Sequence, residues 1–434
     1  MHVLIVGAGW AGLSAAVQAV QRGWRVTLLE ASRQLGGRAR ALQHHDRRLD
    51  NGQHILIGAY TDTLSLMRTL GVHPDDVLHR LPLALVRPDG SGLSLPHGPA
   101  PWHLLFGVLR APGWTWQDRL SLLRTAWQWQ RHDFTCDAHT TVTDLCSRVS
   151  PRVMDQLIEP LCVSALNTPA HQACGAVFLR VLRDALWSGA GSSDLLLPTT
   201  DLGALMPDAA FDWLTSRGVN IQTGHRWTPP ATPGAVGDHL SAPAEAIVLA
   251  CPAWEAARLT AECAPAWSAQ AQALRHAPIT TVYVQHPDPA FTGLPWPMMA
   301  LSSDAQHPAQ FVFDRGQLFG SSQRGLLACV VSDSTGTREA LEQQVMAQLQ
   351  NQLHVILDPA ALKGLRVVQT VVEKRATFVC TPGLQRPTAS IAPGWWACGD
   401  YVDGPYPATL EGAVRSGREV IDQIAQTRER EGRL

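Results

Sequence analysis

The sequence predicts an α/β protein in which a dinucleotide-binding unit alternates along the chain with a mixed sheet-and-helix unit. Three observations carry this prediction: a glycine-rich turn after the first apolar strand, an acidic residue that ends the second strand, and a strand-loop-helix segment near the C-terminus. A chain of 434 residues is too long for one ordinary core and suits two domains. Its 45% hydrophobic and 17% charged residues are typical of a globular protein with a large buried interior.

The first expected element is a buried parallel strand over residues 2–6, a short apolar run with β-branched side chains. Glycines follow at G-x-G-x-x-G spacing, directly before an alanine-rich helix. The first glycine permits the tight turn, the second lets a pyrophosphate approach the backbone, and the third lets the helix pack on the strand. The candidate cofactor contacts in this Rossmann-like motif are Gly7, Gly9, Trp10, Ala11 and Gly12.

A second strand, Trp24 to Glu30, places an acidic residue about 20 positions after the glycines, where a ribose hydroxyl needs an acceptor. Ala31 follows it and is included as a candidate contact. The chain continues to Gly36-Gly37-Arg38, in which a glycine pair lets backbone pass close to a ligand and an arginine offers two donors to pyrophosphate. This extension resembles the FAD fingerprint of the flavin amine oxidase and carotenoid desaturase superfamily.

The next polar stretch, Asp50-Asn-Gly-Gln-His-Ile-Leu-Ile-Gly58, has two open interpretations. In a fold that places Gly36-Gly37-Arg38 at a pyrophosphate, this stretch returns along the flavin ring, and Gly52, Gln53 and His54 become cofactor contacts. The alternative is an ordinary hairpin with Asn51-Gly52 at its tip.

A strand near the C-terminus ends in Gly399-Asp400, where the aspartate can accept a hydrogen bond from a ribityl hydroxyl. A loop then feeds a helix whose N-terminus lies near Ala408 and Thr409. The partial positive charge of a helix N-terminus can stabilise negative charge on the pyrimidine edge of a reduced flavin.

These motifs define a discontinuous division of the chain. Residues 1–58, 205–262 and 372–434 are expected to form the FAD-binding domain, and residues 59–204 and 263–371 the substrate-binding domain. A proline-, glycine- and alanine-rich loop is expected over residues 229–244.

The segment 114–131 is unusually rich in tryptophan and is expected to be helical. Trp116, Leu120, Leu123 and Trp127 fall on one helical face. Two interpretations stay open: the helix packs on its own protein, or its apolar face lies in a membrane interface, where tryptophan is enriched.

Composition excludes several classes of partner and site. The net charge of −2 gives no electrostatic reason to expect nucleic acid. Nine scattered cysteines form no C-x-x-C pair and no zinc-ligand spacing, so neither a redox dithiol nor a metal site is expected. The first strand begins at residue 2 and no long apolar run appears, so a cytoplasmic protein is expected, with peripheral contact at the inner membrane face left open.

Taken over its whole length, the chain resembles the squalene-associated FAD-dependent desaturases, whose members are hydroxysqualene dehydroxylases. The motifs that carry the resemblance are the glycine turn, Gly36-Gly37-Arg38, the stretch from Asp50 to Tyr60, and residues 397–417, with weaker support from Glu159-Pro-Leu and Arg375-Ala-Thr-Phe. The fold it implies is a Rossmann-like FAD-binding domain of the glutathione-reductase type. It also implies an adenine-side contact at Trp227, where the family often has valine.

The resemblance implies an enzyme in which reduced FAD delivers hydride to an allylic carbon of hydroxysqualene as the hydroxyl leaves. The substrate is then a hydrophobic isoprenoid in an apolar tunnel. His54, Asp50 and Tyr406 are the candidate proton donors. Because no second G-x-G-x-x-G motif follows another strand, an external donor is expected to reduce the flavin.

Three alternatives stay open: a carotenoid or phytoene desaturase, a flavin amine oxidase, and a non-catalytic FAD-binding lipid carrier. The amine oxidase is disfavoured because neither Lys363 nor Lys374 stands in a stretch that can be placed at the flavin.

Overall fold

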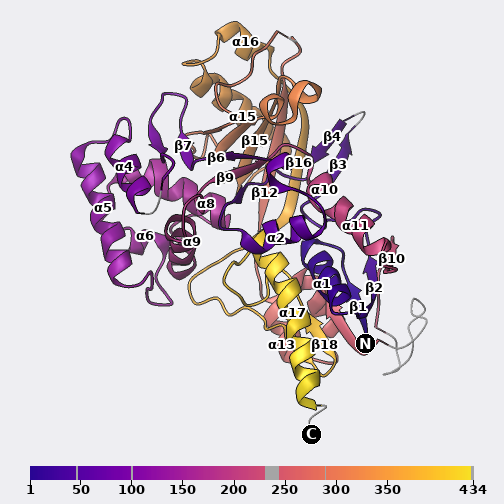
Figure 1. The fold of residues 1–434 in the computed structure, drawn as a ribbon. Helices are drawn as coiled ribbons and strands as arrows, with labels where there is room; N and C mark the ends of the chain where they lie inside the picture. The colour runs from indigo at the N-terminus through magenta and orange to yellow at the C-terminus, as the bar shows by residue number, and fades with distance from the viewer. Residues whose placement is uncertain (45–46, 99–100, 230–243, 289, 432–434) are drawn as a thin grey trace.

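The computed structural model of the chain describes residues 1–44, 47–98, 101–229, 244–288 and 290–431. Figure 1 shows two sheets with a separate lobe of helices to one side. The loop expected over 229–244 falls almost entirely on residues 230–243, which lie outside the described residues. Within the described ranges, no helix is long and apolar enough to cross a membrane.

The first sheet has six strands drawn from the beginning, middle and end of the chain. Its order is β10 (Asn220–Thr223), β2 (Arg25–Glu30), β1 (His2–Val6), β11 (Ala246–Leu249), β18 (Trp395–Ala397) and β17 (Ser390–Ala392). The first five strands run parallel, and β17 joins as an antiparallel edge. The parallel sheet confirms the predicted α/β class.

Helices cover both faces of this sheet because successive strand residues point to opposite sides. Val3 and Ile5 belong to the core shared with α1 (Trp10–Gln21) and α17 (Leu410–Glu431). Leu4 and Val6 belong to the core on the other side, shared with α12 (Ala253–Thr260) and α13 (Pro265–Gln272). A strand buried on both faces explains why residues 2–6 are an unbroken apolar run.

The second sheet is antiparallel. Its order is β13 (Met298–Ala300), β14 (Phe311–Asp314), β15 (Leu326–Ser332), β12 (His276–Gln285) and β16 (Arg366–Phe378). Val282 and Val284 face the helix α15 (Arg338–Leu353), whereas Tyr283 and Phe313 face the helical lobe. The domain boundary expected at residue 372 falls inside β16, which pairs with β12 as far as Phe378.

A helical lobe and several short elements complete the fold. The lobe holds the hairpin β7 (Ala84–Val86) and β8 (Gly92–Ser94), then α4 (Trp102–Arg110), α5 (Trp116–Arg131), α6 (Val142–Leu145), α7 (Pro151–Val153), the π-helix η1 (Met154–Ile158), α8 (Glu159–Leu166) and α9 (Gly175–Trp187). The remaining elements are β3 (Ala41–His44), β4 (Arg47–Asp50), β5 (Leu56–Ile57), α2 (Thr61–Thr69), α3 (Pro74–Val77), β6 (Leu78–Leu81), β9 (Leu195–Pro198), α10 (Leu202–Leu205), α11 (Pro207–Thr215), α14 (Arg315–Phe319), the 3-10 helix η2 (Gly320–Gln323) and α16 (Pro359–Gly364).

The hairpin interpretation of Asn51-Gly52 is wrong. Strand β4 pairs antiparallel with the preceding strand β3 and ends at Asp50, so the β3–β4 hairpin ends before Asn51. The next strand, β5, pairs instead with β9. Asn51 and Gly52 therefore lie on a connection between two different sheets.

A buried ion pair joins the β3–β4 hairpin to the second sheet. Arg315, at the start of α14, donates to Asp50 over 2.9 Å, and both side chains are almost fully buried. Tyr283 of β12 donates its hydroxyl to the Asp50 backbone carbonyl at 3.0 Å. A buried charge that keeps its partner is tolerated, whereas one left alone is strongly destabilising.

We expect Arg315→Met to lower the free energy of unfolding by about 3–5 kcal/mol, because it leaves the Asp50 carboxylate buried without a counter-charge. Urea denaturation followed by tryptophan fluorescence measures the change. The matched control is Arg22→Met, which breaks a half-exposed pair with Asp422 of similar length and is expected to change stability by about 1 kcal/mol or less. Equal losses in the two variants would contradict the role given to the buried pair.

Candidate cofactor and active site

The turn between β1 and α1 is built where no side chain fits. Gly7 has a φ of +109°, and a Cβ placed there would lie 2.6 Å from the carbonyl oxygen of Ala250. A Cβ on Gly12 would lie 1.9 Å from the carbonyl oxygen of Gly7. These two glycines therefore hold α1 against its strand, which directs the free N–H groups of the helix toward the turn.

Gly9 differs from its two neighbours because space remains beside it. A Cβ there would have Gly37 Cα as its nearest neighbour, at an ordinary contact distance of 3.8 Å. Gly36 donates its N–H to the Ala8 carbonyl at 2.8 Å, so the second glycine pair crosses directly over the first turn. The two glycine segments predicted from the sequence thus form one backbone cradle.

Glu30 lies at this cradle, as expected for the acidic residue that ends the second strand. Its carboxylate accepts from the Ala8 N–H at 2.7 Å and from the Ser32 N–H at 2.8 Å. Ala31, between Glu30 and Ser32, is exposed. An anionic group at the mouth of a glycine turn suits a ribose hydroxyl.

The two ends of the predicted site meet in an ion pair. Arg38 donates to Asp400 over 2.5 Å and also to the Ala376 carbonyl at 2.5 Å. Burial by itself lowers the pKa of Arg38, but the Asp400 carboxylate outweighs it and holds that pKa above the ordinary value. The guanidinium therefore stays charged beside the cradle, and residues 362 positions apart in sequence face the same space.

The loop after Gly399 is held in a strained conformation that aims the start of α17. Gly399 donates its N–H to Ser416 at 2.8 Å, and Ala408 has a left-handed φ of +57°, which is rare for a residue with a side chain. Ala408 donates its N–H to the Asp400 carbonyl at 3.0 Å. Thr409 then caps the helix by accepting from Gly412 at 3.0 Å.

Three of the predicted contacts have evident packing roles. The buried Trp10 indole donates to the Ala39 carbonyl at 3.1 Å, which ties the start of α1 to the segment after Arg38. Ala11 is buried where α17 crosses α1. Trp227 is buried in the core under the sheet, with its ring centroid 5.8 Å from that of Trp395. Direct contact of these side chains with a cofactor stays a prediction.

The stretch after β4 contacts Arg315 through Gln53 and the cradle through Asn51, whose side-chain amide donates to the Arg38 carbonyl at 2.9 Å. Gln53 accepts from Arg315 at 2.9 Å. His54 shares a hydrogen bond of 3.0 Å between Nδ1 and the Gly52 carbonyl, and burial lowers the pKa of His54. A neutral imidazole that donates through Nδ1 has Nε2 as an acceptor, so at neutral pH this ring is better suited to accept a proton than to donate one.

Asp50 is poorly placed to donate a proton. One carboxylate oxygen accepts from the Leu202 N–H at 2.8 Å and the other from Arg315. Burial raises the pKa of Asp50, and Arg315 opposes that rise. Because both oxygens are occupied by donors, the hydrogen bonds favour the ionised carboxylate in a structural role.

Tyr406 connects the helical lobe to the loop between Gly399 and α17, which we call the flavin-side loop because the flavin is expected there. Its hydroxyl donates to Asp184 of α9 at 2.6 Å, and the Arg415 guanidinium lies 4.7 Å from its ring centroid. Burial, and then the hydrogen bond with Asp184, raise the pKa of Tyr406 to about 12. The hydroxyl therefore keeps its proton at neutral pH.

Three polar residues that sequence reasoning did not select hold this arrangement together: Arg315, Asp184 and Glu411. Glu411 is fully buried and accepts from the backbone N–H groups of Asp62 and Thr63 at 3.0 and 2.9 Å, which caps α2. Each partner is more than 200 positions away in sequence, so no local spacing could have revealed the pairing.

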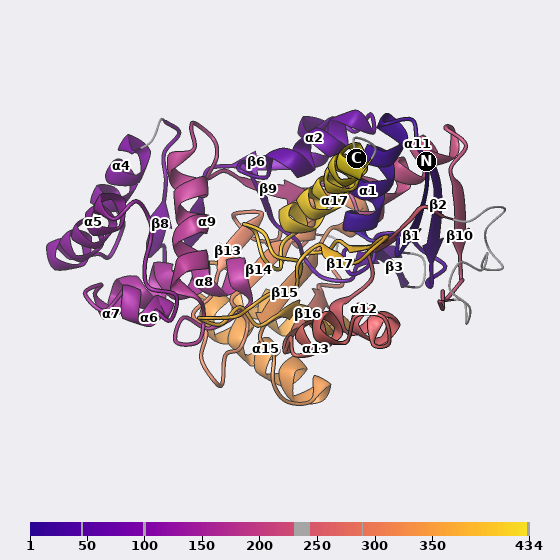
Figure 2. The same cartoon turned by 90° about the horizontal axis from the view of Figure 1, so that it is seen from below.

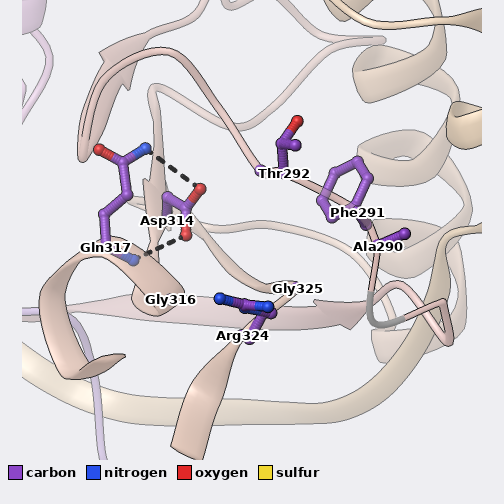
Figure 3. Close-up of a pocket in the computed structure, with 9 residues that line it drawn as sticks. Ala290, Phe291, Thr292, Asp314, Gly316, Gln317, Arg324 and Gly325 are labelled. Atoms are coloured by element: carbon purple, nitrogen blue, oxygen red, sulfur yellow. Dashed lines mark hydrogen bonds between the residues drawn. The ribbon is translucent and has the colours of Figure 1, made fainter. Parts of the chain in front are cut away.

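Two cavities lie outside the cradle. One has a volume of about 360 Å³ and is lined by polar and apolar residues alike. Figure 3 shows that the backbone N–H and the side-chain amide of Gln317 both donate to Asp314 in this cavity. The other lies between α4, α5, α8 and α9 and is lined entirely by apolar residues. At about 30 Å³ this cavity has room for roughly one water molecule, and we call it the apolar seam.

The donor set of the cradle fits the expected FAD. It combines an open backbone approach at Gly9, a charged guanidinium at Arg38, and carboxylates at Glu30 and Asp400. The glycine turn and Arg38 would hold the pyrophosphate, Glu30 a ribose hydroxyl, and Asp400 the ribityl chain. Among the described residues, no group of three or more His, Cys, Asp or Glu side chains could hold a metal ion.

Comparisons with known proteins agree over the length of the chain. A family model described as flavin containing amine oxidoreductase matches residues 10–425. Hydroxysqualene dehydroxylase from Zymomonas mobilis subsp. mobilis is 28% identical across 96% of this chain and 97% of its own. The protein of the same name from Rhodopseudomonas palustris is 27% identical across 97% of this chain and 98% of its own.

Solved structures share the fold. Cyclohexylamine oxidase from Brevibacterium oxydans covers 99% of each chain, with a TM-score of 0.69 and 15% sequence identity. At that identity the likeness concerns the fold alone.

We expect Gly9→Val to give folded but colourless protein, because the added side chain would enter the space left for the pyrophosphate. The flavin absorbance of the purified protein measures this, and circular dichroism checks the fold. The matched control is Gly98→Val, at a glycine whose added Cβ would meet only the His103 Cβ, at 3.7 Å, and which should stay yellow. Yellow Gly9→Val protein would overturn the assignment of the cradle.

Proposed function

The chain belongs to the flavin containing amine oxidoreductase family and is an FAD-dependent oxidoreductase, and we propose that it reduces hydroxysqualene to squalene. The observation that carries the proposal is its similarity, from end to end, to two proteins named hydroxysqualene dehydroxylase. Shorter similarity confined to the glycine motifs would support FAD binding but no particular substrate.

When bound, reduced FAD supplies a hydride that takes the place of the allylic hydroxyl group, which leaves with one proton as water. An external donor of two electrons must then restore the reduced cofactor. The chain itself has to bind an apolar substrate, hold its hydroxyl near a proton donor, and exclude bulk water.

The helical lobe is suited to the apolar part of such a substrate. Its seam is lined by apolar side chains of α4, α5, η1, α8 and α9, including Leu182 and Leu186 of α9. The same helix carries Asp184, which accepts a hydrogen bond from the hydroxyl of Tyr406. Tyr406 lies two residues before Ala408 in the flavin-side loop. A chain bound along α9 would therefore approach the flavin-side loop at its polar end. Because the seam is narrow, we expect the helices around it to separate on binding.

Tyr406 is the best supported of the three candidate proton donors. Asp50 has both oxygens engaged by donors, and His54 is neutral at physiological pH. Tyr406 keeps its proton and is held by an acidic partner. We propose that this hydroxyl turns from Asp184 to the substrate and delivers its proton to the departing hydroxyl group, and that the resulting tyrosinate takes up a proton from water before the next turnover.

The decisive experiment incubates photoreduced enzyme with hydroxysqualene under anaerobic conditions and follows the products by mass spectrometry. We expect squalene, with one turnover for each reduced flavin. A polyene with an added double bond, formed from a more saturated precursor by the oxidised enzyme, would identify a desaturase. If flavin remains bound and neither product forms, the dehydroxylase and the desaturase functions are both excluded, and a non-catalytic FAD-binding lipid carrier is favoured.

We expect Tyr406→Phe to lower the turnover of hydroxysqualene by about 10²-fold while flavin content stays unchanged, because the variant lacks the proton but keeps the ring. Single-turnover oxidation of the bound reduced flavin measures the rate. Asp50→Asn and His54→Gln are the comparison variants. A normal rate in Tyr406→Phe would remove this residue from the proton path.

A further inference from the structure

The two helices at the outer end of the lobe expose large apolar side chains. The described residues include nine large hydrophobic side chains that are exposed, and five of these lie on α4 and α5. Together they form what we call the tryptophan face: Trp102, Phe106, Trp116, Leu120 and Trp127. Trp116 is 66% exposed and Trp127 56%. A monomer rarely leaves so many aromatic side chains together in water without a partner.

This face is additional to the side of the helix that packs on the protein. Leu122, Ala126 and Trp129 of α5 are buried against the lobe and line the apolar seam. Of the stripe singled out in the sequence, Trp116, Leu120 and Trp127 are turned away from that core, whereas Leu123 lines the seam. The helix is therefore anchored by one apolar stripe and presents a second one outward.

Figures 1 and 2 show α4 and α5 at the edge of the molecule, away from the first sheet and from both chain ends. Between these helices and the rest of the lobe lies the apolar seam, to which α4 contributes Leu104 and Val108. The face thus forms the outer surface of the part of the fold that contains the seam.

The charge on these helices is one-sided. Residues 101–131 contain four arginines and one acidic residue, Asp118, which is buried and engaged in the N-terminal cap of α5. Three of the arginines lie over the exposed rings: Arg110 over Phe106, Arg119 over Trp116 and Arg131 over Trp127, at 6.0, 5.1 and 4.6 Å. Each exposed aromatic side chain of these three pairs thus has a cation beside it.

We propose that the tryptophan face docks on the surface of a bilayer that contains anionic phospholipid. Tryptophan rings prefer the headgroup level of a membrane, and arginines beside them can bind lipid phosphates. A second copy of the chain is a poorer occupant, because a two-fold contact through this face would bring arginines against arginines. The proposal concerns where the enzyme works and stands apart from the identity of its substrate.

The test is co-sedimentation of the full-length holoenzyme with vesicles of phosphatidylcholine, with and without one third phosphatidylglycerol. We expect binding to be stronger to the anionic vesicles and to fall with added salt. The double variant Trp116→Gln/Trp127→Gln should bind the anionic vesicles at least about tenfold more weakly than the parent. Arg124→Gln, at an exposed arginine outside the three ring pairs, should weaken binding by about fivefold.

Trp296→Gln is the matched control, because Trp296 is 58% exposed but lies elsewhere in the fold, and it should bind vesicles as the parent does. Flavin content and melting temperature show whether each variant is folded. Equal vesicle binding by the parent and the double variant would overturn the proposal. A second result would also overturn it: the parent does not bind vesicles but forms a dimer in light scattering, and the double variant is a monomer.

Discussion

The structure depends on places where two backbone segments approach too closely for any side chain to stand between them. Gly7 lies against Ala250, and Gly12 lies against the carbonyl of Gly7. At the other end of the chain, a Cβ on Gly417 would lie 2.2 Å from the carbonyl oxygen of Ala11. These contacts hold α1 on its strand and α17 on α1. The shape of the cofactor cradle is therefore fixed chiefly by backbone contacts, and its charged side chains project from that backbone.

Around that frame, long-range polar contacts link the cradle to the rest of the molecule. Asp50 is tied to Arg315 of the second sheet, and Tyr406 to Asp184 of the helical lobe. Each contact begins within a few residues of the predicted flavin position and ends in a different part of the fold. These contacts fix the position of the helical lobe relative to the cradle through hydrogen bonds as well as through packing, because buried polar groups demand specific partners.

The sequence predicted the parallel strands and singled out both glycine segments, Arg38 and Asp400, because each belongs to a short motif with a fixed geometric meaning. It did not predict that Arg38 and Asp400 form an ion pair. It could not predict Arg315, since nothing within a few residues of it marks a buried cation, and its partner lies 265 positions away. Nor could periodicity tell which side of α5 is buried: Trp116 and Trp127 form one apolar stripe, Leu122 and Trp129 another, and only the surrounding fold decides between them.

The strand order of the first sheet also has a consequence for how the protein is made. Strand β18, at Trp395–Ala397, pairs with β11, and β11 pairs with β1 at the start of the chain. During synthesis, β11 leaves the ribosome with one edge open and stays so while nearly 150 further residues are added. The parallel sheet can therefore be completed only after the last segment of the chain has emerged, and until then β11 keeps an open apolar edge.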